Sequence, residues 1–310
     1  MCITVTVAEP QKNRNPLLDK GREFSSTPLR LCVSVSLCLL FAAACRGPAP
    51  RTLEVVAVPA AAIPADPGDR AWQDAPEYAA KLLPQDLVEP RLMKPSTAEV
   101  LVRAVTSGDQ IAFRLQWADP AQDDLPGASQ FLDACAIQIP TKIEPDLPDP
   151  QMGTPGKPVE ISYWRADWQA TANGREDNIR ALFPNATVDH YPFDAPSLQP
   201  GSGQQLEFAK RYAPADAAGN RRAGPRQSPV EDLVAEGPGT LSPAEKTLSR
   251  AKGIYANASW SVVIVRRRPA GLAPAARTQI AFAVWEGSQS EVGSRKMRSP
   301  WIPLAVREVR

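Results

Sequence analysis

The chain has 310 residues, of which 33 are prolines, and its 35 basic and 34 acidic residues leave a formal charge of +1. This length is enough for one large core or two modest ones, and the proline content with few aromatic residues favours short strands and long loops over a helical bundle. A charge this close to zero provides no field that would gather nucleic acid, so we expect no nucleic-acid partner.

Histidine and cysteine restrict the possible metal and cofactor sites. His190 is the single histidine, which excludes haem with two histidine ligands and zinc sites with three. The five cysteines form no CxxC or CxxCH motif, which excludes covalent c-type haem and four-cysteine clusters.

Residues 1–44 are interpreted as a signal peptide. An apolar run of about 14 residues at 31–44 follows several basic residues, and it is shorter than the about 20 residues that a membrane-spanning helix needs. Three alanines then precede Cys45, as in a bacterial lipobox, although Ala42 stands where leucine is usual. We therefore expect a periplasmic lipoprotein anchored to the membrane through Cys45, with plain secretion or an uncleaved anchor as alternatives.

Residues 45–66 are rich in alanine and proline and predict a tether, followed by one domain over 67–310. The segment 76–83 is predicted to be a short helix or irregular. Apolar residues then alternate over 99–105 and 111–117 around a turn, which predicts a β-hairpin.

Further strands are predicted where alternation returns, and the segment 170–250 is weakly patterned. No helices alternate with these strands, so the fold class is expected to be mainly β, an antiparallel β-sandwich with short helical insertions and long loops. The further predicted strands are 131–140, 159–164, 258–266, 279–285 and 301–306.

Met152 lies in an unusual place, a loop of glycines and prolines that leads directly into the strand beginning at Val159. Such a loop seldom needs a methionine to fill a core, so we interpret Met152 as an axial ligand of a haem iron. Its thioether would favour reduced iron. The alternative is a methionine that fills a packing gap.

Several short motifs and their order resemble a known family. The chain is similar, over about 52–308, to the haem-b-binding γ subunit of ethylbenzene dehydrogenase, with relatives in dimethylsulfide dehydrogenase, selenate and chlorate reductases and nitrite oxidoreductase. The motifs are Trp117-Ala118-Asp119-Pro120, the Met152-Gly153 loop, Tyr163-Trp164-Arg165-Ala166, Trp260-Ser261-Val262-Val263 and Phe282-Ala283-Val284-Trp285-Glu286-Gly287.

The resemblance implies a β-sandwich that holds one non-covalent haem b between a methionine and a lysine. It further implies a non-catalytic protein that passes electrons between an outside carrier and the molybdopterin and iron–sulfur subunits of an oxidoreductase. The methionine corresponds to Met152 and the lysine to Lys296, with Lys252, Lys157 and His190 as weaker alternatives for the second ligand.

Other side chains allow further interpretations. Arg165 is a candidate partner of the haem propionates or of another protein. Asp119 and its neighbours Asp123 and Asp124 match no EF-hand spacing, so we expect them to be solvated. The rival function is a haem-free carbohydrate-binding module with three tryptophans, Trp72, Trp117 and Trp164, as sugar platforms.

Overall fold

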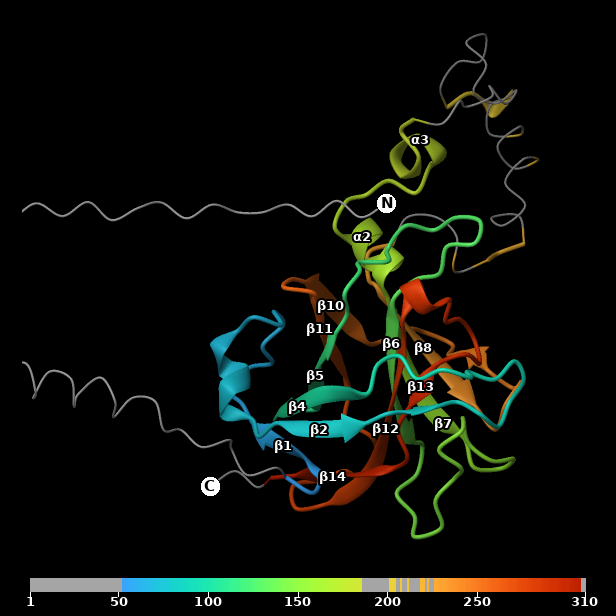
Figure 1. Cartoon of the computed structure of the whole chain (residues 1–310). Helices are drawn as coiled ribbons and strands as arrows, with labels where there is room; N and C mark the ends of the chain where they lie inside the picture. The colour runs from blue at the N-terminus through green and yellow to red at the C-terminus, as the bar shows by residue number, and fades with distance from the viewer. Residues whose placement is uncertain are drawn as a thin grey trace, which may run out of the picture. The chain divides into compact units, whose positions relative to one another are not determined.

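The computed structural model describes residues 52–185, 201–204, 207, 211, 218–220, 222 and 226–307 (Figure 1). Contacts divide the chain into two compact units between Pro50 and Arg51, and every described residue belongs to the second unit. The expected signal peptide, Cys45 and His190 lie outside the described residues. No helix in the described part of the chain is long and apolar enough to cross a membrane.

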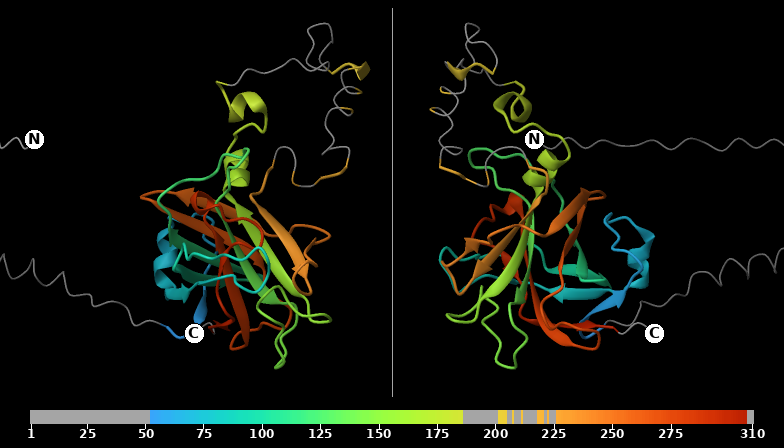
Figure 2. Two further views of the ribbon diagram at one scale, coloured as in Figure 1. Left: turned by 45° about the vertical axis from the view of Figure 1, so that its right-hand side comes forward. Right: turned by 180° about the vertical axis from the view of Figure 1, so that it is seen from behind.

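The strands of the second unit form one hydrogen-bonded sheet that folds into two layers (Figure 2). These layers are called the first and second sheets, and strand β12 belongs to both. The mainly β sandwich expected from the sequence is confirmed. The first sheet contains β10 (Arg250–Tyr255), β11 (Ser259–Arg267), β5 (Gln110–Ala118), β4 (Glu99–Ser107), β2 (Tyr78–Lys81), β1 (Val55–Pro59), β14 (Ile302–Val306) and the first half of β12 (Arg277–Trp285). The second contains the rest of β12 with β6 (Ala134–Pro140), β7 (Val159–Arg165), β8 (Val230–Ala235), β9 (Ser242–Pro243), β13 (Met297–Arg298) and β3 (Leu83–Pro84).

The described helices are short and lie outside the strands. They are η1 (Arg70–Asp74), α2 (Ala166–Ala172), α3 (Ile179–Leu182) and η3 (Gly287–Gln289). The 76–83 segment, expected as a helix or irregular, instead supplies β2, which pairs antiparallel with β4.

Strand β1 corrects the expected domain boundary. It lies between β14 and β4 and runs parallel to both, whereas the other strand pairs are antiparallel. Val55 and Ala57 are fully buried in the main core. The prediction of a tether over 45–66 is therefore wrong from Val55 onward. Residues 55–59 form a central strand, which the alanine-rich and proline-rich composition did not indicate.

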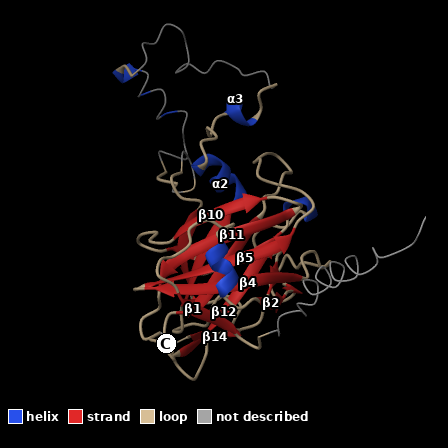
Figure 3. Ribbon diagram, turned by 90° about the vertical axis from the view of Figure 1, so that its left-hand side faces the viewer, coloured by secondary structure: helices blue, strands red, loops and turns tan. Residues whose placement is uncertain are grey.

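The space between the sheets is filled by the alternating apolar residues that predicted the strands. Near one end of it, Trp164 contacts Trp117 and Trp260 edge to face, with ring centroids 6.4 and 4.9 Å apart. On the opposite face of the first sheet lies the short helix η1 (Figure 3). Its Trp72 packs with residues of β4, β5 and β11. Trp72, Trp117 and Trp164 are each at most 2% exposed, so the expectation that they form sugar platforms is wrong.

Candidate functional site

A cavity of about 420 Å³ lies on the face of the second sheet that points away from the main core. This volume falls in the range of about 300–1,000 Å³ that is usual for small-molecule pockets. Its lining is mostly apolar and joins the sheet to the loops around Met152 and Lys296. The lining includes Val88, Ala136, Met152, Ile161, Tyr163, Leu233, Ala281, Ala283, Trp285 and Lys296.

The cavity floor results from the alternation of β6, β7 and β12. In β6 and β12 the residues between the floor positions point into the main core, as Ile137 and Phe282 do. On the floor, Ala283 pairs with Ala136 and Ala136 pairs with Tyr163. Two alanines side by side leave room above the sheet that larger side chains would fill.

Met152 is held over this floor by the long connection between β6 and β7. The Gln138 side chain donates a hydrogen bond to the Pro150 carbonyl (3.0 Å), and the Trp301 indole donates one to the Pro148 carbonyl (2.7 Å). Met152 itself packs against the apolar residues of the second sheet. The loop position is therefore fixed by Gln138, which lines the cavity, and by Trp301, which packs beside the same apolar cluster.

The backbone at Met152 adopts an unusual conformation. Met152 has φ of +73°, in the left-handed region that non-glycine residues seldom adopt. The next residue, Gly153, has φ of +90°, and a Cβ there would approach the Ala235 carbonyl oxygen to 2.8 Å. The Met152 carbonyl accepts a hydrogen bond from the Gly237 amide (2.7 Å). Backbone strain of this kind concentrates at functional sites.

Lys296 reaches the cavity from the connection that follows β12. Its carbonyl accepts a hydrogen bond from the Gln85 amide (2.9 Å), and its Nζ lies 5.0 Å from the centre of the Trp285 ring. The next residue, Met297, points the other way into the main core and is 1% exposed. Met297 therefore has a structural reason to follow Lys296: it fills the main core while Lys296 lines the cavity on the other side.

The environment of Lys296 favours its neutral form. Burial, together with the positive charge of Arg298, lowers the pKa of Lys296 to about 8. A lysine must be deprotonated to bind a metal ion, and a shift from about 10.4 to neutrality costs about 4–5 kcal/mol in an ordinary setting. Burial in the folded protein already accounts for part of this shift in pKa.

Three arginines also line the cavity. Arg165 forms two hydrogen bonds to Asp167 (2.9 and 2.6 Å), and Arg222 donates one to Glu231 (2.9 Å). Arg298 is held more loosely, because its nearest carboxylate is 3.7 Å away. Its Nε is also buried without a hydrogen-bond partner. Sequence reasoning missed Arg298. Its spacing of two residues from Lys296 indicates a shared face only once the segment is known to be extended.

The alternative lysines are placed elsewhere. Lys252 lies on β10 and forms an ion pair with Asp66 (2.6 Å), while Lys157 forms one with Asp146. Neither lines the cavity that contains Met152. Lys296 is thus the one lysine of the described residues that lines the cavity.

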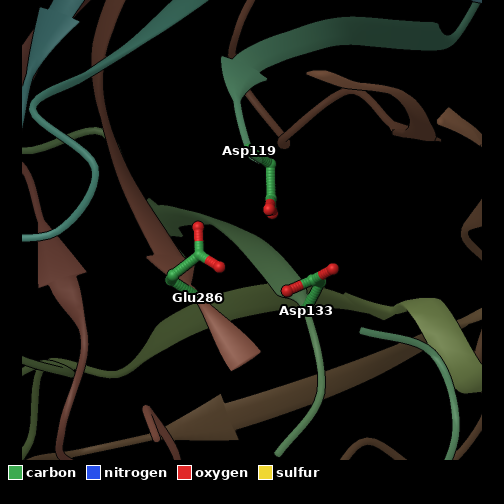
Figure 4. Close-up of side chains that lie close together, drawn as sticks. All are labelled: Asp119, Asp133 and Glu286. Carbon is green, nitrogen blue, oxygen red and sulfur yellow. The ribbon is translucent and has the colours of Figure 1, made fainter. Parts of the chain in front are cut away.

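The acidic loop after β5 differs from the expectation. Asp119 is fully buried and lies near two other buried carboxylates, Asp133 and Glu286 (Figure 4). Asp124 pairs with Arg175 (3.0 Å). The prediction of a solvated loop is wrong for Asp119, because the chain turns inward as β5 ends.

The family model described as ethylbenzene dehydrogenase matches residues 69–297, which is most of the chain. The chain belongs to this family. The resemblance found in the sequence motifs is therefore confirmed.

Two relatives of this ethylbenzene dehydrogenase family member share about a quarter of the residues aligned with it. A Haloferax mediterranei protein, a respiratory nitrate reductase heme subunit by name, is 25% identical over 86% of this chain and 80% of its own length. The chlorate reductase subunit gamma of Ideonella dechloratans is 25% identical over 62% of this chain and 80% of its own. A solved family 9 carbohydrate-binding module from Caldicellulosiruptor kristjanssonii covers 83% of this chain and 96% of its own, at 6% identity and a TM-score of 0.37, too low to support any conclusion.

Proposed function

We propose that this protein is an electron-transfer subunit that holds one non-covalent haem b in the cavity, with Met152 and Lys296 as axial ligands. The observation that carries the proposal is that these two side chains, far apart in the sequence, line one apolar cavity. The relatives named as a heme subunit and as a gamma subunit of reductases support the same cofactor and role.

The residues of the cavity fit such a group. The alanine floor leaves space for a flat apolar molecule, and the pKa of Lys296 is already lowered, so deprotonation for iron binding costs less than for an exposed lysine. When bound, haem supplies a one-electron iron couple, whose potential a thioether ligand raises. We propose Arg298 and Arg165 as partners of the propionates, with Arg298 favoured because its guanidinium has a free buried N–H.

No substrate site is required for this role, since both axial positions would be filled by protein. The proposed partners are the molybdopterin and iron–sulfur subunits of an oxidoreductase, in line with the reductases to which the relatives belong by name. Copurification of these subunits with the tagged chain from its native host would test the assignment. Isolation of the chain alone, with haem bound, would count against a stable complex.

Reconstitution with haem tests the ligands. The purified protein should take up one haem and show a low-spin spectrum when reduced. Met152→Ala should abolish the low-spin bands, and Lys296→Ala should change them. Met93→Ala and Lys157→Ala are matched controls, because Met93 is 81% exposed and neither residue lines the cavity. A protein that stays colourless would refute the proposal.

We further propose that the protein is exported and anchored through a lipid on Cys45 in the periplasm. The apolar run at 31–44 and the alanines before Cys45 support this proposal. Radiolabelled palmitate should enter the wild-type protein and not Cys45→Ser. Equal labelling of both proteins would contradict lipidation at this position.

A further inference from the structure

Three buried carboxylates gather where strands of both sheets end. Asp119 directly follows β5, Asp133 directly precedes β6 and Glu286 directly follows β12. Oxygen atoms of the three, one from each, all lie within 4.8 Å of one another (Figure 4). All three residues are at most 4% exposed. The cluster therefore joins the first sheet to the second at one end of the sandwich.

Asp133 is held in a fixed orientation. One of its oxygens accepts hydrogen bonds from the Trp260 indole (2.9 Å) and the Asp123 amide (2.7 Å). The other accepts one from the Gly287 amide (2.9 Å). A Cβ at Gly287 would approach the Phe131 carbonyl oxygen to 2.5 Å, so this close approach requires glycine. The backbone at Gly287 and Asp123 is thus positioned to donate hydrogen bonds to the Asp133 carboxylate.

Asp119 is incompletely satisfied. Its Oδ1 accepts a hydrogen bond from the Ala121 amide (3.1 Å), but its buried Oδ2 has no partner. In Figure 4 its side chain points toward the space between Glu286 and Asp133. A fully buried carboxylate oxygen without a partner costs several kcal/mol in folding unless something else binds there.

The negative charge of the cluster is also uncompensated. Within the described part of the chain, no lysine or arginine forms an ion pair with any of the three carboxylates. Burial and repulsion from Asp133 and Glu286 raise the pKa of Asp119 to about 8, and burial raises that of Asp133 to about 6. Either protons or a cation must neutralise such a group.

We infer that Asp119, Asp133 and Glu286 bind a calcium ion that stabilises this end of the sandwich. The ligands are all oxygens, which suits a hard cation and disfavours zinc. Three oxygen atoms within 4.8 Å of one another surround a space close to that of one ion at calcium–oxygen distances of about 2.3–2.6 Å. Magnesium loses its waters reluctantly and usually keeps several of them, which suits a fully buried cluster less well.

The proposed ion would tie the ends of β5, β6 and β12 together. It does not depend on haem, because none of its three ligands lines the cavity. Its test therefore uses the haem-free protein, with ion binding and thermal unfolding as the measurements. Failure of the haem proposal would leave this test unaffected.

The first experiment uses terbium, a luminescent substitute for calcium. Terbium added to the EDTA-treated full chain should show emission sensitised by the tryptophan that contacts the cluster, Trp260, at one ion per chain. Calcium should displace it, and magnesium should do so only at much higher concentration. The midpoint of thermal unfolding should rise in calcium relative to EDTA, as for any ligand of the folded state.

Two variants locate the ion. Asp119→Asn and Glu286→Gln should each weaken calcium affinity by at least about tenfold and remove the calcium-dependent rise in the unfolding midpoint. Asp109→Asn, in the exposed β4–β5 turn, is the matched control and should behave as wild type. Near-ultraviolet circular dichroism establishes that each variant is folded, and having two variants keeps the test valid if one fails to fold.

The competing arrangement is a set of carboxylates that share protons. In that case wild type would show no terbium emission and the same unfolding midpoint in EDTA and in calcium, and Asp119→Asn would be at least as stable as wild type. This result would overturn the inference. Terbium emission that is unchanged in both variants would also overturn it, because the ion would then lie elsewhere. Equal competition by magnesium would overturn the assignment to calcium.

Discussion

Lys296 should make haem binding depend on pH. Burial places its pKa at about 8, below the usual value of about 10.4. The folded haem-free protein therefore loses this proton at lower pH than the unfolded chain does, so its stability should rise between about pH 8 and 10. Haem affinity should rise about tenfold per pH unit below pH 8 and level off above it.

The measurement is a haem titration followed by the low-spin absorbance at several pH values. Lys296→Ala is the reference, because it has no amine to deprotonate at this position. If wild type and Lys296→Ala show the same pH dependence, Lys296 is not the ligand that titrates.

Met152 offers a separate test of backbone strain. Its φ of +73° is unfavourable for any residue with a Cβ and acceptable for glycine. Haem-free Met152→Gly should therefore be more stable than haem-free Met152→Ala by about 1 kcal/mol, although both lack the thioether. Chemical denaturation of the two variants measures the difference. A more stable alanine variant would show that the loop is not strained at this residue.

The paired alanines of β6 and β12 should control whether a cofactor fits. Ala136→Leu places a larger side chain in the cavity, where there is space for it, so the haem-free protein should keep its stability within about 1 kcal/mol. Haem uptake should be lost, because the floor is filled. Thermal unfolding and haem titration separate the two effects.

Ala305→Leu is the matched control for this substitution. Ala305 is a partly buried residue of β14 in the first sheet and does not line the cavity. It should bind haem as wild type does. Full haem binding by Ala136→Leu would place the cofactor away from this floor.

The sequence predicted the site residues that stand out by loop composition or family resemblance, and missed those that depend on tertiary contacts. Met152 stood out because a proline and glycine loop has no core to fill, and Lys296 was assigned through the family resemblance. Both line the cavity. Arg298 was missed because a two-residue strand gives no visible alternation, and burial of Asp119 was missed because the direction of a chain after a strand depends on tertiary contacts.

At the scale of the whole molecule, the domain begins at β1, about a dozen residues before the start at residue 67 that the sequence predicted. A chain that begins at residue 67 would lack the strand between β4 and β14, leaving both with unpaired edges. We expect it to be insoluble or unfolded, whereas a chain that begins at residue 52 should fold cooperatively. Circular dichroism and thermal unfolding of the two proteins distinguish the outcomes. A folded, cooperative chain from residue 67 would show β1 to be dispensable.

The same strand explains the limit of sequence-based prediction of this fold. Strands β4, β5, β11 and β12 are nine residues long each and are rich in β-branched and large apolar residues, so they were predicted. Strand β1 has valines on both faces because both of its faces are covered. Strand β8 carries Glu231, a buried acidic residue that interrupts its apolar pattern and pairs with Arg222.

The early start of β1 also limits how far the domain can stand from a membrane. If Cys45 carries a lipid, only residues 46–54 separate the anchor from the sheet, and these span at most about 32 Å when fully extended. A tether that reached residue 66 would allow about twice that distance. The start of β1 would stay within the shorter distance of the membrane, so a redox partner would have to reach a domain held near the bilayer.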